Sequence, residues 1–354
     1  GISTGFGALA TVAIPPDRRV ALQAALVRSH AAGMGPPVED EVVRAMVLLR
    51  ARTLALGHSG ARPLVAQAMV DLLNAGISPT VPEYGSLGAS GDLAPLAHGA
   101  LALMGEGHVV HDGVVKPAAD ALADAGLTPI RLAEKEGLAV TNGTDAILGM
   151  LCLAVVDTQR LLEQADMIAA MAIEALLATD APFAADLQAL RPQPGQAVSA
   201  ANLRALLAGS PIVASHATPE DTRVQDAYSI RCTPAVHGAV RDTLAHCRWV
   251  AENELAAAID NPMVLDDGRV ESCGNFHGAP LGFAADFLAI AVAEIGAIAE
   301  RRMDRMLDRT RSHGRARPLS GPAPSSCLYR ARLVDMQARP SPLRHQSGLA
   351  RPPL

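Results

Sequence analysis

Residues 143–178 read GTDAILGMLCLAVVDTQRLLEQADMIAAMAIEALLA, a stretch rich in alanine, leucine, isoleucine and methionine with few helix breakers. Residues from about 278 to 308 have the same character. A helix of about 30 residues is about 45 Å long, because each residue advances the axis by about 1.5 Å. Helices of that length need neighbours along their whole course, so the two stretches predict a bundle of long helices.

Shorter elements are predicted on either side of the first long stretch. Apolar residues recur at helical spacing in residues 17–33, 38–57 and 63–74, which predicts three helices. Asp-Gly pairs between aliphatic residues predict small β-hairpins at 108–115 and 263–270. The expected fold class is therefore mainly α: a long-helix bundle with a smaller N-terminal helical part and short β-hairpins.

Composition narrows the class of protein. The chain has 354 residues, is 49% hydrophobic and carries a net charge of −6, which excludes a disordered chain and argues against nucleic acid as a partner. Its longest uninterrupted apolar stretch, Ala146 to Val156, is shorter than the roughly 20 residues of a membrane span. No signal segment opens the sequence, so a cytoplasmic location is expected, with no membrane partner. The histidines lack ligand spacing, so no metal is expected.

Residues 309–354 differ from the rest of the chain. They hold nine arginines, seven prolines and one acidic residue, Asp335. One interpretation is a disordered basic tail. The other is a reading-frame error or truncation after about Asp308, with the break near Arg309 to Arg315. The predicted organisation is thus an N-terminal part at 1–140, a long-helix part at 141–308 and an atypical tail at 309–354.

Two interpretations are possible for the segment Gly85-Ser-Leu-Gly-Ala-Ser-Gly-Asp-Leu-Ala-Pro-Leu-Ala-His98. The simpler one is a turn before a helix that starts near Pro95, with Asp92 available as its N-terminal cap. The chemical one is a backbone cyclisation. The Gly91 nitrogen attacks the Ala89 carbonyl carbon, one water leaves, and Ser90 loses its hydroxyl as a second water. Glycine is needed on the attacking side because a Cβ would obstruct the bend.

All sixteen positions from Gly85 to Ala100 fit the signature of the aromatic amino acid ammonia-lyases, which this sequence resembles. The resemblance implies that Ala89-Ser90-Gly91 forms the self-derived 4-methylidene-imidazol-5-one (MIO) group, with no external cofactor. It also implies fumarase/aspartase-like central helices and a homotetramer whose active sites form at subunit junctions. Other segments that resemble the family's motifs are Gly1–Gly7, Asn142–Thr144, Val224–Cys232, Asn261-Pro262 and Gly274–Gly278.

The resemblance also implies roles for single residues. Tyr228 would move a proton or position the substrate, and Arg231 would bind the substrate carboxylate with its bidentate fork. Asn142 would hydrogen-bond the MIO carbonyl oxygen, where negative charge develops. Gln225 and Phe276 would line the pocket. The structural alternatives stay open: a core tyrosine, a surface arginine, a helix-capping asparagine and a packing phenylalanine.

His30 is the residue that bears on substrate choice. Ser-His at this place resembles the histidine-specific branch of the family, since an imidazole can hydrogen-bond the substrate imidazole. The implied reaction converts L-histidine into trans-urocanate and ammonia, the first step of histidine degradation. A histidine outside this context is usually structural. Two other interpretations are a phenylalanine or tyrosine ammonia-lyase or aminomutase of the same family, and an inactive helical remnant of the lyase.

Two family features are not found in this sequence. The catalytic-base tyrosine of the family immediately precedes the position of Gly1. A Gln-Glu-Asp motif with a substrate-contacting glutamate is expected well beyond Glu300-Arg301-Arg302, and none follows. The resemblance is expected to stop at Asp308 and therefore predicts an impaired or inactive chain.

Overall fold

The computed structural model describes the chain except residues 1, 88–90, 219–220, 222–223, 309 and 313–354. The described residues are mostly helical, with a few short strands, which confirms the predicted fold class. They form two compact units. The first combines Gly1–Leu153 with Val250–Ala284, and the second combines Ala154–Trp249 with the described part of Ala285–Ser341. The predicted segments 1–140, 141–308 and 309–354 stay a prediction, and most of the third lies outside the described residues.

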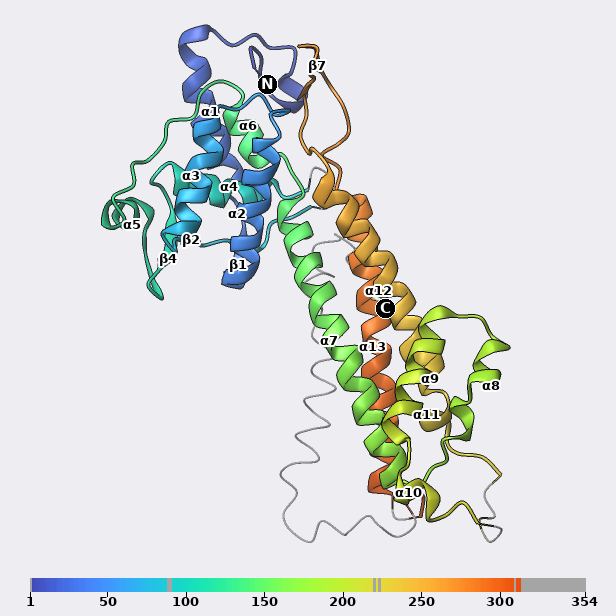
Figure 1. Cartoon of the computed structure of the whole chain (residues 1–354). Helices are drawn as coiled ribbons and strands as arrows, with labels where there is room; N and C mark the ends of the chain where they lie inside the picture. The colour runs from blue at the N-terminus through green and yellow to red at the C-terminus, as the bar shows by residue number, and fades with distance from the viewer. Residues whose placement is uncertain (1, 88–90, 219–220, 222–223, 309, 313–354) are drawn as a thin grey trace, which may run out of the picture. The chain divides into compact units, whose positions relative to one another are not determined.

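The first unit is built mainly from short helices around one apolar core (Figure 1). Met46, Leu72 and Leu96 are buried in this core, one from each of α2, α3 and α4. The prediction for residues 63–74 is confirmed at both ends by α3. The helices are η1 (Gly7–Leu9), α1 (Pro16–His30), α2 (Asp40–Ala55), α3 (Pro63–Asn74), α4 (Leu93–Leu103), α5 (Ala118–Asp124) and α6 (Glu136–Thr141).

Small antiparallel sheets complete the first unit. Both predicted hairpins are confirmed, as β4 paired with β5 and as β6 paired with β7. Asp112 and Gly113 have φ of 53° and 73°, the paired positive values that a tight two-residue hairpin turn requires. The strands are β1 (Met34–Pro37), β2 (Ser78–Pro79), β3 (Pro82–Tyr84), β4 (His108–His111), β5 (Val114–Pro117), β6 (Met263–Val264) and β7 (Val270–Glu271), in the orders β1-β3, β2-β4-β5 and β6-β7.

The predicted long helices exist as α7 (Asp145–Ala175) and α13 (Ala279–Leu307). A third, α12 (Thr233–Ala256), packs with them, and smaller helices join them in the second unit (Figure 1). Phe183, Leu203 and Ile230 are buried in the core of this unit. The smaller helices are η2 (Ala181–Phe183), α8 (Ala185–Ala189), α9 (Pro194–Leu207), α10 (Pro211–Ala214) and α11 (Tyr228–Arg231).

Two helical stretches have the length and apolar composition of a membrane span, Glu136–Ala175 and Ala279–Leu307. The core helices of soluble bundles share both properties. In the first stretch, 72% of the most apolar window is buried inside the structure, and in the second 39%. The expectation of no membrane partner therefore stays a prediction.

One local prediction is confirmed only in part, since Asp92 occupies the N-cap position of α4 but its side chain does not cap that helix. The helix expected to start near Pro95 begins at Leu93, and Asp92 makes no side-chain hydrogen bond at its N-terminus. Asp92 instead accepts hydrogen bonds from Ala146 and Ile147 at the start of α7. The cap residue was recognised, but it serves a helix that begins more than fifty positions later, which neighbouring sequence cannot reveal.

Candidate active site

Two hydrogen bonds link the residues on either side of the Ala-Ser-Gly segment's undescribed part. The Leu87 amide and the Ser86 hydroxyl both donate to the Gly91 carbonyl, at 3.4 and 3.3 Å. Gly91 has φ +61°, and a Cβ there would lie 2.1 Å from the Gly143 carbonyl oxygen. Only glycine fits this position, for both conformational and steric reasons. Ala89 and Ser90 themselves lie outside the described residues.

Asp92, the residue after Gly91, is bonded to the N-terminus of α7. Its side chain is fully buried, and Oδ2 accepts from the amides of Ala146 at 2.7 Å and Ile147 at 3.0 Å. Its own amide donates to the Gly143 carbonyl at 2.8 Å. Burial raises the pKa of Asp92 to about 7, against the lowering effect of these amides. The residue after Gly91 is therefore held through both its backbone and its side chain by one segment, residues 143–147.

Asn142 follows α6 and faces a loop from the distant segment around Pro262. Its Nδ2 donates to Asp260 Oδ1 at 3.1 Å and to the Asn261 carbonyl at 3.2 Å. Both partners are acceptors, so the amide nitrogen must point at them and the orientation of the side chain is fixed. Both amide hydrogens are thus engaged, and a bond to another acceptor requires one of them to change partner.

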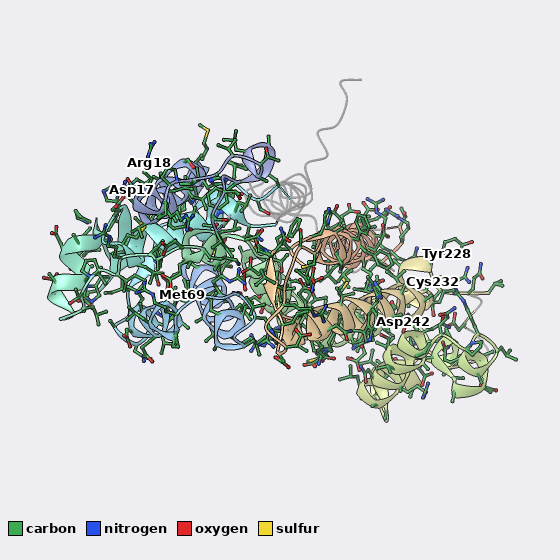
Figure 2. All side chains as sticks on the ribbon, turned by 90° about the horizontal axis from the view of Figure 1, so that it is seen from above. Asp17, Arg18, Met69, Tyr228, Cys232 and Asp242 are labelled. Atoms are coloured by element: carbon green, nitrogen blue, oxygen red, sulfur yellow. The ribbon has the colours of Figure 1, made fainter. Side chains whose placement is uncertain are left out.

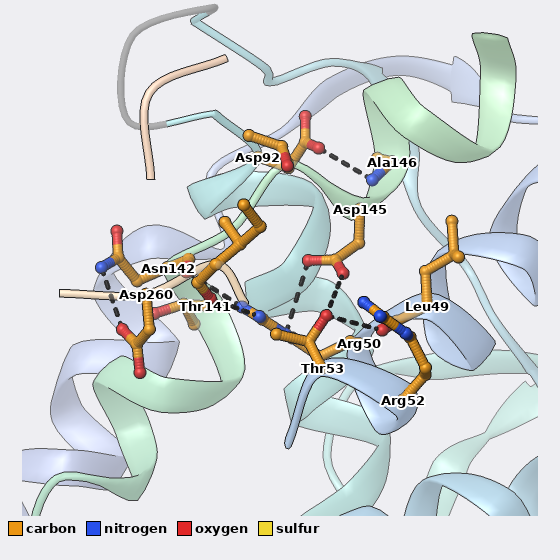
Figure 3. A network of polar contacts seen from close by, with 12 residues as sticks. Leu49, Arg50, Arg52, Thr53, Asp92, Thr141, Asn142, Asp145, Ala146 and Asp260 are labelled. Atoms are coloured by element: carbon orange, nitrogen blue, oxygen red, sulfur yellow. Dashed lines mark hydrogen bonds and ion pairs between the residues drawn. The ribbon is translucent and has the colours of Figure 1, made fainter. Parts of the chain in front are cut away.

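Arg50 is the central cation of this network (Figure 3). Its side chain is fully buried and donates to the carbonyls of Asn142 at 2.9 Å and Ile259 at 2.8 Å. Its Nε lies 3.4 Å from Asp145 Oδ2. A Cβ on Gly143 would lie 2.5 Å from the Arg50 guanidinium, so the loop packs directly on this cation. Arg50 therefore fixes the backbone on both sides of the site.

A second buried ion pair supports the same loops. Lys135 Nζ donates to Asp260 Oδ2, and both side chains are at most 4% exposed. Burial lowers the pKa of Lys135, although Asp260 opposes that effect. Since Asp260 also accepts from Asn142, the ion pair and the amide form one connected network.

The segment that carries Phe276 is tied to the same region. Asn261 Oδ1 accepts from the Cys273 amide at 2.8 Å and from the Ser272 hydroxyl at 3.0 Å. Phe276 follows three residues after Cys273 and is half-buried. The motifs around Gly91, Asn142 and Asn261 thus converge within the first unit.

His30 ends α1, also in the first unit. Its Nδ1 lies 2.9 Å from the Leu26 carbonyl and 3.0 Å from the Ser29 hydroxyl, so both neighbours of this nitrogen come from its own helix. The ring is half-buried. Three residues on, the Gly33 amide donates to His98 Nε2 at 3.2 Å, which connects the chain after His30 to α4.

Tyr228 and Arg231 lie on α11 in the second unit, where Figure 2 labels Tyr228 and the following Cys232. The Arg231 guanidinium carbon sits 4.4 Å from the centre of the Tyr228 ring, and its Nε donates to the Asp226 carbonyl at 3.1 Å. The Tyr228 side chain is 71% exposed. The ring is therefore not part of the described core of the second unit, and its role stays a prediction.

A pocket of about 740 Å³ lies beside α11. Gln225 and Tyr228 line it, so the structure brings these two predicted residues together. Arg231 does not line it. Its other wall is the charged end of α13, with Glu294, Arg301, Asp304 and Arg305.

The predicted site residues therefore fall into two groups. Gly91, Asn142, His30 and Phe276 belong to the first unit, and Tyr228, Arg231 and Gln225 to the second. Sequence reasoning missed Arg50, Lys135 and Asp260. Asp260 directly precedes the Asn261-Pro262 motif, which was the available signal for it. For Arg50 on α2 and Lys135 just before α6 the sequence offers none, because basic residues are usually exposed.

Comparison with known proteins finds a family model and several relatives. A family model described as aromatic amino acid lyase matches residues 1–337, beyond Asp308, where the resemblance was expected to stop. Histidine ammonia-lyase of Streptomyces avermitilis is 62% identical over 315 residues, covering 89% of this chain and 61% of that protein. Histidine ammonia-lyase of Deinococcus radiodurans is 50% identical, over 87% of this chain and 59% of that protein. The chain thus spans less than two thirds of these relatives.

Solved structures share the fold. The crystal structure of histidine ammonia-lyase from Trypanosoma cruzi has a TM-score of 0.78 at 41% identity, covering 88% of this chain and 58% of that one. Tyrosine aminomutase from Streptomyces globisporus has a TM-score of 0.87 at 37% identity, covering 98% of this chain and 72% of that one.

Proposed function

The chain belongs to the aromatic amino acid lyase family, and from this premise we propose that it serves the non-oxidative deamination of L-histidine to trans-urocanate and ammonia. The observation that carries the proposal is the close approach of Gly91 to Gly143, which leaves room only for glycine in the Ala-Ser-Gly segment. The names of the most similar relatives support histidine as the substrate.

The residues around the segment fit a self-derived MIO group. The bonds from Ser86 and Leu87 to the Gly91 carbonyl hold the two flanks of the segment close to each other, which favours ring closure between Ala89 and Gly91. Gly91 has the positive φ and lacks the Cβ that would obstruct the bend. Ala89, Ser90 and Gly91 are all the protein needs to supply, so no external cofactor is proposed.

Once formed, the ring supplies an electrophile that captures the substrate amine and so makes it a better leaving group. Arg231 binds the substrate carboxylate, with a guanidinium that the Tyr228 ring and the Asp226 carbonyl already orient. Tyr228, with its exposed phenol, moves or positions a proton. Asn142 donates to the ring oxygen by releasing one of its two long bonds, to Asp260 or to the Asn261 carbonyl.

His30 sets the preference for histidine. In the tautomer that donates from Nδ1 to the Leu26 carbonyl, the ring presents Nε2 as an acceptor to the N–H of a substrate imidazole. A phenyl ring offers no such donor. Gln225, which lines the pocket beside α11, and Phe276, in the first unit, are proposed as further substrate contacts.

The assembly proposed for this chain is a cytoplasmic homotetramer with active sites at subunit junctions. Supporting it, α13 leaves large apolar side chains exposed, with Phe283 at 77% and Ile290 at 58%. Such a face is expected on a helix that packs against other copies.

A second candidate is another activity of the same family, a phenylalanine or tyrosine ammonia-lyase or an aminomutase. The TM-score of 0.87 with a tyrosine aminomutase favours keeping it. An inactive helical remnant remains the third candidate. A substrate panel separates them: urocanate from L-histidine supports the proposal, cinnamate, coumarate or a β-amino acid supports the second, and no product supports the third.

The mass of the proteolytic peptide that contains residues 85–98 tests the ring itself. A deficit of two waters is the expected result, because ring closure and serine dehydration each release one. An unmodified mass contradicts the proposal, since the segment would then lack its electrophile.

A further inference from the structure

The second unit contains a buried cluster of charged and polar side chains centred on His237. The His237 ring is fully buried, with Nδ1 2.7 Å from Asp166 Oδ1 and Nε2 3.3 Å from Arg302 Nη2. The other carboxylate oxygen of Asp166 accepts from Arg241 at 2.7 Å and from Asn202 at 2.8 Å. The cluster joins α7, α9, α12 and α13.

The partners of His237 define its protonation state. A guanidinium can only donate, so Nε2 accepts from Arg302, and the proton sits on Nδ1 and is donated to Asp166. The imidazole is therefore neutral. Burial lowers the pKa of His237, as do the charges of Arg302 and Arg241, while Asp166 opposes them. Burial also raises the pKa of Asp166, but the hydrogen bonds from His237, Asn202 and Arg241 outweigh it and lower the pKa overall.

Arg302 connects this cluster to α11. Its Nε donates to the Ser229 carbonyl at 2.7 Å, and its Nη2 donates to Thr233 Oγ1 at 2.9 Å. Ser229 lies between Tyr228 and Arg231 on a helix of four residues. A helix that short is not stable by itself, so bonds from outside must hold it in place. Arg302 is only 3% exposed, so its N–H groups bond to these protein partners and not to solvent.

We propose that Arg302 is a positioning residue for the site: through the Ser229 carbonyl it fixes α11 and so aims Tyr228 and Arg231, and it does so while His237 is neutral. This inference rests on the proposed roles of Tyr228 and Arg231. The proposal also assigns a role to the second arginine of the Glu300-Arg301-Arg302 segment.

A pH dependence follows from this arrangement. The groups that face His237 are Asp166 from α7, Arg241 from its own helix and Arg302 from α13. A proton added at Nε2 would place a donor and a positive charge against the Arg302 guanidinium. Arg302 would then lose its acceptor, and its hold on Ser229 would weaken. Since the pKa of His237 is lowered, this loosening begins below the usual titration range of histidine, about pH 6.5.

Amide hydrogen exchange on the full chain tests the proposal. Arg302→Gln should lower the protection of the amides in residues 229–233 about tenfold, the effect of losing one hydrogen bond of about 1.4 kcal/mol. Arg241→Gln is the matched control, because Arg241 contacts Asp166 and Ser199 but not Ser229. It should change the same amides less than about twofold. Equal changes in the two variants would mean that Arg302 is general structural support, and would overturn the proposal.

Conservative variants keep the test valid if Arg302→Gln does not fold. Arg302→Lys keeps one donor group, so the protection of the α11 amides should lie between that of the parent and that of Arg302→Gln. Full loss of protection would show that the charge and length of a lysine are insufficient, and would contradict the assigned bond to Ser229. His237→Gln keeps an acceptor for Arg302 and cannot be protonated. Protection of α11 in the parent should fall as the pH is lowered from about 6.5 to about 4, and the fall should be absent in His237→Gln. The same fall in both proteins overturns the role of His237.

The same samples report the ring separately. The two-water deficit in the peptide containing residues 85–98 tests the proposed function, whereas the α11 amides test Arg302. A parent chain without the deficit would fail the first test and leave the second readable. If the parent shows the deficit but Arg302→Gln does not change the protection of the α11 amides, only the second test fails.

Discussion

Asp92 and Ala146 are joined by a hydrogen bond of 2.7 Å between a carboxylate oxygen and a backbone amide, so the residue that follows Gly91 caps the longest described helix. The N-terminus of a helix favours a negative charge. Burial opposes that charge and raises the pKa of Asp92 to about 7. The segment with the proposed chemistry is thus anchored by a group whose charge changes near neutral pH.

The stability of the fold should depend on this carboxyl group. Its pKa in the folded chain, about 7, is above the value of about 4 expected when unfolded, so the folded state holds the proton more tightly. The stabilising contribution is full below about pH 4 and is lost as the pH rises towards about 7. Asp92→Asn lacks this titration. The Tm of the parent minus that of Asp92→Asn should therefore fall between pH 4 and 7, and a difference that rises with pH would contradict the prediction.

Gly91→Ala should prevent ring closure. The added Cβ would meet the Gly143 carbonyl oxygen at 2.1 Å, and alanine disfavours φ +61°. The peptide containing residues 85–98 should then show no loss of water by mass spectrometry. Gly99→Ala is the matched control, because its Cβ meets only Met46 Cε at 3.4 Å. That variant should keep the two-water deficit of the parent; ring formation in Gly91→Ala would refute the steric argument.

Asp260→Asn should destabilise the first unit strongly. It leaves Lys135 buried without its carboxylate, at a cost of about 3 kcal/mol in the free energy of unfolding. Urea unfolding should show this loss, and Lys135→Met combined with Asp260→Asn should recover part of it. Glu106→Gln breaks the exposed pair with Arg28 and should cost less than about 1 kcal/mol. If Asp260→Asn and Glu106→Gln lower the free energy of unfolding by similar amounts, then burial of the Lys135–Asp260 pair does not increase its contribution to stability.

His30→Leu should change substrate preference. Losing an acceptor for the imidazole N–H should lower kcat/KM for L-histidine at least about tenfold, the effect of one hydrogen bond in a polar site. The rate with L-phenylalanine relative to L-histidine should rise. His108→Leu, at an exposed position on β4, serves as the control and should leave both rates as they are. An unchanged preference in His30→Leu would remove His30 from the substrate site.

Local signals in the sequence predicted local structure well. Helical spacing gave α3 at its observed bounds, and Asp112-Gly113 gave the turn of the β4-β5 hairpin, because these features depend on neighbours in the chain. Asp92 was recognised as a cap but assigned to the wrong helix, since its partners lie 54 and 55 positions away.

The buried charges could not be predicted in the same way. Arg50 and His237 lie on helices whose sequences do not distinguish a buried polar residue from an exposed one. Their burial is explained only by partners at long range, such as the Asn142 carbonyl for Arg50 and Asp166 for His237. The motif glycine Gly91 was found from its chemistry, whereas its tight contact with Gly143 required the structure.

The bond between Arg50 and the Ile259 carbonyl spans 209 positions of sequence. During synthesis, the first unit cannot complete its polar network until the ribosome has made α12 and the loop after it. The entropy cost of closing a loop grows only slowly with its length. The network is therefore completed late mainly because Ile259 is synthesised late, and less because the loop is costly to close. Ring formation at Gly91 should therefore be a late event of maturation, and nascent chains that end before Ile259 should carry the unmodified tripeptide.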